Sequence, residues 1–169
     1  MKQLASFESA FDKMMEDEGG YVLHEIPGDR GGMTYAGIAR KMNPNWEGWQ
    51  YIDYTETPPT QLVRDFYKTN FWNKIRGDEI ESDVIASSIF NFAVNTGVSV
   101  ASKLAQICVK TAPDGSIGPK TVQALNQVNP ELFVAYYALA KIARYRDIVT
   151  RDRSQMKFLL GWLNRTLKL

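Results

Sequence analysis

Apolar residues recur at three- and four-residue intervals along most of this chain, and this spacing predicts amphipathic helices. The first such series consists of Leu4, Phe7, Phe11, Met14 and Met15. Glu18 continues the series, and Gly19 and Gly20 follow it. Glycine readily takes the left-handed backbone conformation with which many helices end. We therefore predict a first helix that ends at Glu18.

The helical signal disappears between Tyr21 and Pro59. Pairs of turn-forming residues divide this stretch at Pro27-Gly28, Gly31-Gly32, Asn43-Pro44 and Pro58-Pro59. Because such pairs mark turns and loops, we predict a small irregular lobe near the N-terminus, with room for one short β-hairpin.

Helical periodicity returns after this lobe. Thr57 is typical of an N-cap, with Pro58 at the first helical position. Further helices are predicted over residues 84–95 and 98–108, from Gly118-Pro119, from Asn129-Pro130, and after a Ser154 cap, with Phe158 facing inward. No internal repeat, low-complexity tract or long linker separates them. We predict a mainly α protein that forms a single compact domain over residues 1–169.

The composition narrows the chemistry that the chain can perform. Hydrophobic residues make up 44% of its 169 residues, as in folded domains, but it holds one histidine, His24, and one cysteine, Cys108. A structural zinc site uses about four protein ligands and a catalytic one about three, and a disulfide within the chain needs two cysteines. We therefore expect no metal, no other cofactor and no disulfide framework.

Charge is divided unevenly along the chain. Residues 1–60 carry 5 basic and 10 acidic side chains, whereas residues 61–169 carry 15 basic and 9 acidic ones. The basic half favours an anionic polymer such as cell-wall material, nucleic acid or anionic lipid. A solvated helix face is the simpler alternative. Because no known nucleic-acid-binding motif is visible, we expect no nucleic-acid partner.

Neither a signal peptide nor a membrane span is visible in the sequence. The first 15 residues mix charged and apolar side chains, whereas a signal peptide has a continuous apolar region. No apolar run reaches the ~18 residues of a membrane span. We expect synthesis in the cytoplasm and no stable membrane insertion, so a target outside the membrane would require release or export.

Glu18 is the strongest candidate for a catalytic group. It lies on the apolar side of the first predicted helix, whereas Glu16 and Asp17 lie on its polar side. It also occupies the last turn, where the backbone carbonyl dipoles disfavour negative charge. Partial burial acts in the same direction, and a carboxylic acid that keeps its proton is what a general acid requires. The alternative is a boundary glutamate whose side chain reaches solvent.

A glycine-framed segment from Asp29 to Ile38 places a second carboxylate and a hydroxyl after this helix. Most glycosidases cleave the glycosidic bond with a pair of carboxyl groups. Asp29 and Thr34 are therefore candidates for orienting the attacking water or for stabilising the sugar cation. Asp29 as an ordinary turn residue is the alternative. Glu25, just before Pro27, is the competing second carboxylate.

Five short motifs carry a family resemblance. The first two are Glu18-Gly19-Gly20-Tyr21 and Asp29-x-Gly31-Gly32-x-Thr34-x-x-Gly37-Ile38. They resemble the signature of glycoside hydrolase family 108, whose members are lysozyme-like N-acetylmuramidases, many encoded by phages or prophages and some called secretion activators. The others are Asn95-Thr96-Gly97, Asp114-Gly115-x-Ile117-Gly118-Pro119-x-Thr121 and Phe158-x-x-Gly161-Trp162-x-x-Arg165. These three resemble the helical, predicted peptidoglycan-binding region that follows in that family.

The resemblance implies a lysozyme-like helical domain, with a catalytic portion over residues 1–90 and a helical peptidoglycan-binding portion over residues 91–169. It makes Glu18 the general acid that cleaves the β-1,4 bond between N-acetylmuramic acid and N-acetylglucosamine. Asp29 and Thr34 resemble the two water-positioning members of the Glu, Asp, Thr trio in phage-type lysozymes. Their spacing is close to the phage-type spacing without being identical. Sequence leaves both inversion and retention open.

Aromatic residues near these motifs are candidates for substrate binding. Tyr21 and Tyr35 each follow a catalytic motif, and Trp46 belongs to a group of aromatic residues. That group consists of Trp46, Trp49, Tyr51 and Tyr54. Aromatic rings can stack on sugar faces, and packing in a hydrophobic core is the alternative use of the same side chains.

Asn95 is a further substrate-binding candidate, since its amide suits sugar hydroxyls and N-acetyl groups and it lies four residues after Asn91. We expect Arg165 to have a structural role. A cysteine amidase built on Cys108 and His24 is disfavoured, because Cys108 lies on an apolar helical face, where an inert buried thiol is common.

The resemblance predicts peptidoglycan glycan strands as the partner of a monomeric enzyme. A holin-type or other export partner would bring that enzyme from the bacterial cytoplasm to the cell wall. Two other functions stay open. A lytic transglycosylase would use the same Glu18 acid and the C6 hydroxyl of muramic acid in place of water. A non-catalytic peptidoglycan-binding or secretion-accessory protein would keep the fold without turnover, although Glu18, Asp29 and Thr34 together argue against it.

Overall fold

A computed structural model describes residues 4–25 and 32–168 of the chain. Its first elements are α1 (Phe7–Asp17), β1 (Leu23–His24), β2 (Thr34–Tyr35), β3 (Ile38–Ala39), α2 (Gly48–Asp53), α3 (Thr60–Tyr67), the π-helical turn η1 (Lys68–Trp72) and the 3-10 turn η2 (Gly77–Glu79). The later elements are α4 (Asp83–Thr96), α5 (Val98–Cys108), α6 (Pro119–Gln127), α7 (Pro130–Arg151), the 3-10 turn η3 (Arg153–Gln155) and α8 (Met156–Leu167).

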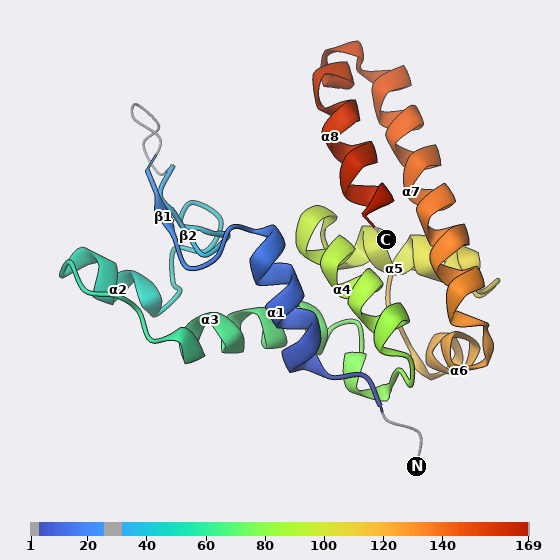
Figure 1. Cartoon of the computed structure of the whole chain (residues 1–169), viewed down its shortest axis with the longest axis horizontal. Helices are drawn as coiled ribbons and strands as arrows, with labels where there is room; N and C mark the ends of the chain where they lie inside the picture. The colour runs from blue at the N-terminus through green and yellow to red at the C-terminus, as the bar shows by residue number, and fades with distance from the viewer. Residues whose placement is uncertain (1–3, 26–31, 169) are drawn as a thin grey trace.

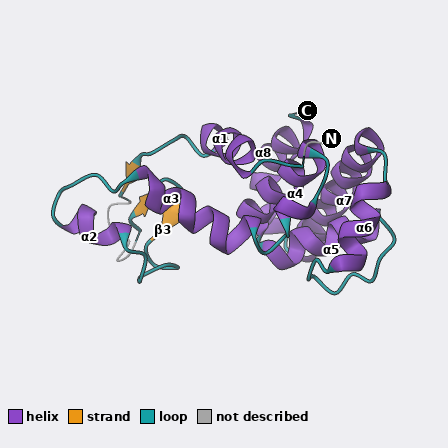
Figure 2. Ribbon diagram, turned by 90° about the horizontal axis from the view of Figure 1, so that it is seen from below, coloured by secondary structure: helices purple, strands orange, loops and turns teal. Residues whose placement is uncertain are grey.

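The described part of the chain is mainly helical, with one small antiparallel sheet near the N-terminus, which confirms the predicted fold class. The sheet and α2 form a lobe at one end of the molecule, and α4 to α8 form a helical body at the other (Figure 1). Seen from below, α1 and α3 lie between these two parts (Figure 2). No helix in the described ranges combines the length and the apolar character that crossing a membrane requires.

Two predicted helix starts are wrong. α3 begins at Thr60 with Pro59 as its N-cap, not next to Thr57. Proline disfavours helical backbone in the residue before it, so Pro59 keeps Pro58 out of the helix. Ser154 does not cap α8 either. It lies in η3, where its amide donates a 3.0 Å hydrogen bond to Asp152 Oδ1, and α8 begins two residues later.

An aromatic cluster holds α1 against the elements on both of its sides. The Phe7 ring contacts Trp72 and Phe90 at centroid distances of 5.8 and 6.0 Å, and Trp72 and Phe90 lie 5.6 Å apart. One turn further along α1, the Phe11 ring lies 5.9 Å from Tyr67 of α3. Because these rings are buried, the cluster fixes the axis of α1 between the lobe and the helical body.

The sheet is small and its turn is unusual. β2 pairs with β1 and with β3, and Ala36 and Gly37 form the two-residue turn between β2 and β3. Both turn residues have positive φ, +49° at Ala36 and +79° at Gly37, as in the mirror-image turns that suit the twist of hairpins. An alanine with positive φ is strained, so contacts outside the sheet must help to hold this turn.

The helical body contains a buried polar centre where α5 leads into α6. Gln106 of α5 is 1% exposed, and its Nε2 donates a 2.8 Å hydrogen bond to Asp114 Oδ1. The Gly115 amide donates a 2.9 Å hydrogen bond to Gln106 Oε1. Hydrogen bonds of this kind offset the cost of burying an amide. The Asp114-Gly115 motif is therefore a turn that is fixed by the preceding helix.

α7 and α8 form a helical hairpin that extends from the body (Figure 1). Trp162 of α8 stacks on Tyr145 of α7 with the ring centroids 5.2 Å apart. Phe158, which we predicted to face inward, is 45% exposed. This prediction is wrong because Phe158 lies in the first turn of α8, at the outer end of the hairpin.

Two glycine substitutions test this packing. A β-carbon at Gly77 would overlap the buried Trp72 indole, so Gly77→Ala should lower the free energy of unfolding by about 1–3 kcal/mol. At Gly161, inside α8, a β-carbon would meet nothing within 4 Å, so Gly161→Ala should raise it by about 0.5–1 kcal/mol. Thermal unfolding measures both changes. Equal effects of the two substitutions would contradict the packing described here.

Candidate active site

Glu18 lies directly after α1 and is half-buried. Its amide donates a 2.9 Å hydrogen bond to the Met14 carbonyl, so its backbone still follows the helix. The Gly19 amide then bonds to the Glu16 carbonyl and the Gly20 amide to the Met15 carbonyl, at 3.3 and 2.9 Å. With Gly19 at φ +85°, this is the pattern of a Schellman cap. The cap fixes the direction in which the Glu18 side chain leaves the helix.

The Glu18 carboxylate lies against the β2–β3 turn. A β-carbon placed on Gly37 would be 3.5 Å from Glu18 Oε2 and 2.5 Å from the Tyr67 hydroxyl oxygen. Glycine is therefore needed at position 37 for two reasons, its positive φ and the closeness of these two groups. Tertiary packing thus brings Glu18, Gly37 and Tyr67 together at one point.

Tyr67 is a site residue that the sequence interpretation missed. It is 1% exposed, and its hydroxyl donates a 2.8 Å hydrogen bond to the Ala36 carbonyl in the strained turn. Burial raises the pKa of the Tyr67 phenol well above its usual value, and the nearby Glu18 charge raises it further. The phenol therefore stays neutral and keeps its donor proton. The sequence pattern that could have identified Tyr67 is a tyrosine on the apolar face of a predicted helix, because a buried hydroxyl needs a hydrogen-bond partner.

The other two members of the predicted trio are placed differently. Thr34 is half-buried in β2, where it pairs with His24 and Ala39. It therefore belongs to the same hairpin whose turn contacts Glu18. Asp29 lies outside the described residues, so its role stays a prediction. Glu25, the competing carboxylate, directly follows β1 and is exposed.

The aromatic candidates differ in their exposure. Tyr21 is 38% exposed, whereas Tyr35 is 4% exposed and its hydroxyl has no hydrogen-bond partner among the described residues. Burial raises the pKa of Tyr35, and nearby Tyr21 contributes. The Tyr35 ring stacks on Trp46 at a centroid distance of 6.0 Å. Tyr35 therefore supports the Trp46 indole from the core. Of the three predicted binding rings, Tyr21 and Trp46 keep accessible surface.

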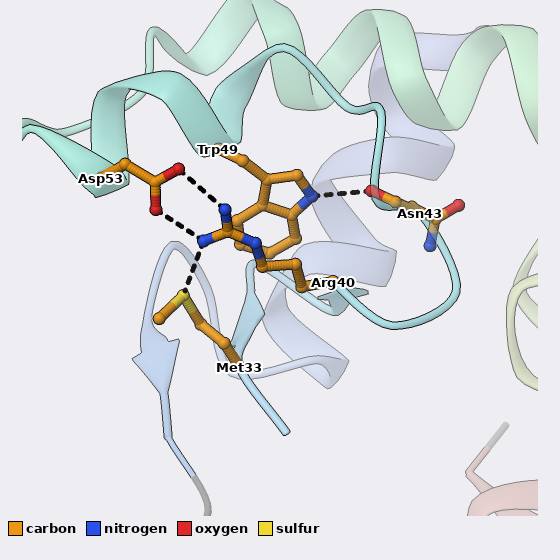
Figure 3. A network of polar contacts seen from close by, with 5 residues as sticks. All are labelled: Met33, Arg40, Asn43, Trp49 and Asp53. Atoms are coloured by element: carbon orange, nitrogen blue, oxygen red, sulfur yellow. Dashed lines mark hydrogen bonds and ion pairs between the residues drawn. The ribbon is translucent and has the colours of Figure 1, made fainter. Parts of the chain in front are cut away.

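A polar network holds the lobe around these rings (Figure 3). The Arg40 guanidinium donates two hydrogen bonds, of 2.6 and 2.7 Å, to the Asp53 carboxylate and also contacts the Met33 sulfur. These bonds lower the pKa of Asp53. The guanidinium lies over the Trp49 ring, whose Nε1 donates a 2.7 Å hydrogen bond to the Asn43 carbonyl. Arg40 thereby joins β3 to α2, a helix that the sequence did not predict.

Trp46 also lines a groove of about 530 Å³ between the segment after β3 and α3. Leu62, Phe66 and Asn70 contribute to the opposite wall, and Glu18 is not among the lining residues. The Trp46 Nε1 donates a 3.3 Å hydrogen bond to the Leu62 carbonyl across the base of this region. The groove and Glu18 are thus separate features of the same lobe.

Asn95 lies on α4, and its side chain is hydrogen-bonded to other residues of the protein. Its Nδ2 donates to the backbone carbonyl and to Oδ1 of Asn91, at 2.9 and 3.1 Å. Its Oδ1 accepts a 2.7 Å hydrogen bond from Arg165 Nη1 of α8. The amide that we expected to face the substrate therefore links two helices, and Arg165 makes a contact of the structural kind that the sequence suggested.

The described residues offer no group of three or more His, Cys, Asp or Glu side chains that would suit a metal ion. Cys108 is half-buried in α5, and burial raises the pKa of its thiol to about 11. A thiol with that pKa is a poor nucleophile at neutral pH. His24 is exposed in β1.

Substitutions at Gly37 and Gly19 separate backbone strain from steric contact. Both glycines have positive φ, so alanine should cost about 1–2 kcal/mol at either position. Only at Gly37 would the new methyl group meet the Tyr67 hydroxyl, which adds about 1–3 kcal/mol. Thermal unfolding of the two variants measures the difference. Tyr67→Phe should relieve part of the Gly37→Ala defect, and equal losses at Gly19 and Gly37 would contradict the contact.

Comparisons with known proteins divide the chain into two matched segments. The sequence model of the glycosyl hydrolase 108 family matches residues 11–97, which is more than half of the chain. The sequence model described as a predicted peptidoglycan domain matches residues 99–167. No curated protein matched the sequence.

The fold is similar to that of a solved structure, the structure of Brucella abortus SagA. The two sequences are 30% identical, the match covers 95% of this chain and 88% of the other, and the TM-score is 0.74. The family match includes Glu18, the β2–β3 turn and Tyr67, which are the residues that meet in the structure. By these findings the chain belongs to the glycosyl hydrolase 108 family.

Proposed function

We propose that the protein is an N-acetylmuramidase that hydrolyses the β-1,4 bond between N-acetylmuramic acid and N-acetylglucosamine in peptidoglycan, with Glu18 as general acid. The observation that carries the proposal is the location of Glu18. Its half-buried carboxylate follows the capped end of α1 and lies beside the turn at Gly37. The glycosyl hydrolase 108 family match and the peptidoglycan domain match support a glycosidic bond of peptidoglycan as the target.

The surroundings of Glu18 suit proton donation. The half-buried carboxyl group lies beside the turn at Gly37 and close to the Tyr67 phenol, whose own proton is donated to the Ala36 carbonyl. In the proposed reaction, Glu18 gives its proton to the glycosidic oxygen. The bond to that oxygen then breaks, and positive charge develops on the muramic sugar ring.

Water completes the proposed hydrolysis. Thr34 is on the hairpin whose turn contacts Glu18, so its hydroxyl is the described group that we assign to orienting the attacking water. Asp29 is assigned to the same step by the family resemblance, as the carboxylate that accepts the water proton or stabilises the sugar cation. The new bond forms between water oxygen and the anomeric carbon of muramic acid, and the product is a reducing end.

Glycan binding is assigned to two partly exposed aromatic side chains, Tyr21 and Trp46. Tyr21 follows Glu18 closely in the chain and is partly exposed. Trp46 is also partly exposed and lines the groove between the post-β3 segment and α3. Sugar rings stack on such faces because aromatic rings combine apolar area with low mobility. We propose that a glycan strand extends from Glu18 towards this groove.

The catalytic assignment predicts a sharp difference between two neighbouring glutamates. Glu18→Gln should reduce the release of reducing ends from purified peptidoglycan at least about a thousandfold, because the amide has no proton to donate to the leaving oxygen. Glu16→Gln is the matched control, since Glu16 is exposed in the last turn of α1, two residues before Glu18. It should keep near-normal turnover. Circular dichroism and thermal unfolding should show both variants folded.

Product analysis separates the proposed reaction from its rivals. Mass spectrometry of the released muropeptides should find reducing ends, whereas anhydro-muramic ends would identify a lytic transglycosylase that uses the same acid. Wild-type protein that binds peptidoglycan without any turnover would identify a non-catalytic module. Near-normal turnover by Glu18→Gln would remove Glu18 from the mechanism.

A further inference from the structure

The C-terminal end of α1 carries an unusual concentration of negative charge. Glu16 and Asp17 are acidic neighbours, the Glu18 carboxyl group follows them directly, and the last turn of α1 contains no basic residue. The backbone carbonyl dipoles at a helix C-terminus add to this negative potential. Because the last turn of α1 supplies no compensating cation, the groups that hold this end of the helix come from other elements.

Those groups come from α4 and α8. Asn91 Nδ2 donates a 3.0 Å hydrogen bond to Asp17 Oδ2. The ammonium group of Lys168, which follows α8, lies 3.6 Å from Asp17 Oδ1. Asp17 is thus contacted from two directions, one neutral donor and one cation, and it is the residue immediately before Glu18.

Asn91 is itself positioned by a chain of hydrogen bonds that ends at a second cation. Arg165 Nη1 donates to Asn95 Oδ1 at 2.7 Å, and Asn95 Nδ2 donates to Asn91 Oδ1 at 3.1 Å. Each amide accepts with its oxygen and donates with its nitrogen, so all donors in the chain point from Arg165 towards Asp17. The positive guanidinium therefore favours the same orientation at every step.

This series of hydrogen bonds joins one matched family segment to the other. Arg165 lies in the part of the chain similar to the predicted peptidoglycan domain, whereas Asp17 and Glu18 lie in the glycosyl hydrolase 108 match. Arg165 and Asn95 each belong to a motif that the sequence singled out, and the structure joins these motifs by a direct hydrogen bond. The proposed reaction makes no other use of either side chain.

The exposure of these groups indicates that they order the end of α1 locally and contribute little to the stability of the whole protein. The Lys168 side chain is 73% exposed and that of Asp17 is 40% exposed. Contacts between charged groups so open to water add little to the free energy of unfolding. These contacts can, however, restrict the end of α1 to one orientation. Such a restriction matters because small errors in the placement of a catalytic group lower reaction rates strongly.

We propose that Arg165 is a positioning residue for Glu18, acting through Asn95, Asn91 and Asp17 to hold the capped end of α1 in its reactive orientation. The inference rests on the proposed function for its effect on catalysis. The physical coupling between Arg165 and the end of α1 does not depend on that function and is measured separately.

The test compares Arg165→Ala with Arg165→Lys and with a control arginine, Arg146→Ala. Arg146 pairs with the adjacent Asp147 on α7 and has no described hydrogen bond to α1 or α4. The first readout is hydrogen exchange of peptides that contain the Glu18 and Gly20 amides, which needs no substrate. Arg165→Ala should speed exchange there at least about fivefold, with other peptides unchanged and the unfolding temperature within about 2 °C of wild type.

The second readout is turnover of purified peptidoglycan. Arg165→Ala should lower kcat about tenfold and leave KM within about twofold, since the residue is assigned to Glu18 placement and not to glycan binding. Arg165→Lys keeps the positive charge and an N–H donor for Asn95, and it should recover most of kcat. Asn95→Ala should lower kcat to a similar extent, and adding it to Arg165→Ala should cause little further loss.

Three outcomes would overturn the proposal. They are unchanged exchange at residues 18–20 in Arg165→Ala, faster exchange throughout the chain, and a defect confined to KM. Glu18→Gln distinguishes this failure from failure of the proposed function. If Glu18→Gln is inactive while Arg165→Ala has wild-type exchange and kcat, the positioning role alone is wrong. If Glu18→Gln stays active, the catalytic assignment is wrong, and the exchange data still decide whether Arg165 orders the end of α1.

Discussion

The hydrogen bond from the Tyr67 hydroxyl to the Ala36 carbonyl is the contact on which the arrangement around Glu18 depends. It joins a buried side chain of α3 to the strained turn against which the Glu18 carboxylate lies. Leaving a buried carbonyl without its donor costs about 1–3 kcal/mol, so the turn cannot easily move away. Two-stranded and three-stranded sheets with strands of two residues have little stability of their own. The helices therefore hold the hairpin in place.

The two matched family segments share their packing. One cluster of buried residues extends from Ala5 in front of α1 to Tyr145 in α7. The Asn126 amide of α6, in the second match, donates to the Glu79 carbonyl and accepts from the Glu81 amide, both in the first match. The predicted catalytic portion therefore relies for support on helices of the predicted peptidoglycan portion. The division at residue 90 remains a prediction about function, since the buried cluster continues across it.

The site was predicted from the sequence to different extents at different residues. Glu18 was identified because it combines an apolar helical face with a following pair of glycines, and the structure places it at a Schellman cap as that pattern indicates. Tyr35 and Asn95 were ambiguous, because an aromatic ring or an amide serves equally in binding or in packing. The structure shows Tyr35 buried beneath Trp46 and the Asn95 amide bonded to α8. Tyr67 was missed, since its hydroxyl partner lies 31 positions away in the chain.

The sequence by itself determined most of the long helices, the position of Glu18 at a helix end and the scarcity of metal-ligating side chains. Helical periodicity and capping depend on residues within about one turn of each other, so they can be read from neighbouring positions. Only the tertiary structure decided which surface Glu18 faces and which groups hold it. Those groups meet through contacts such as the bond between Asn95 and Arg165, which are 70 positions apart. Contacts of that range depend on how α1, α3, α4 and α8 are arranged relative to one another, and no local pattern specifies that arrangement.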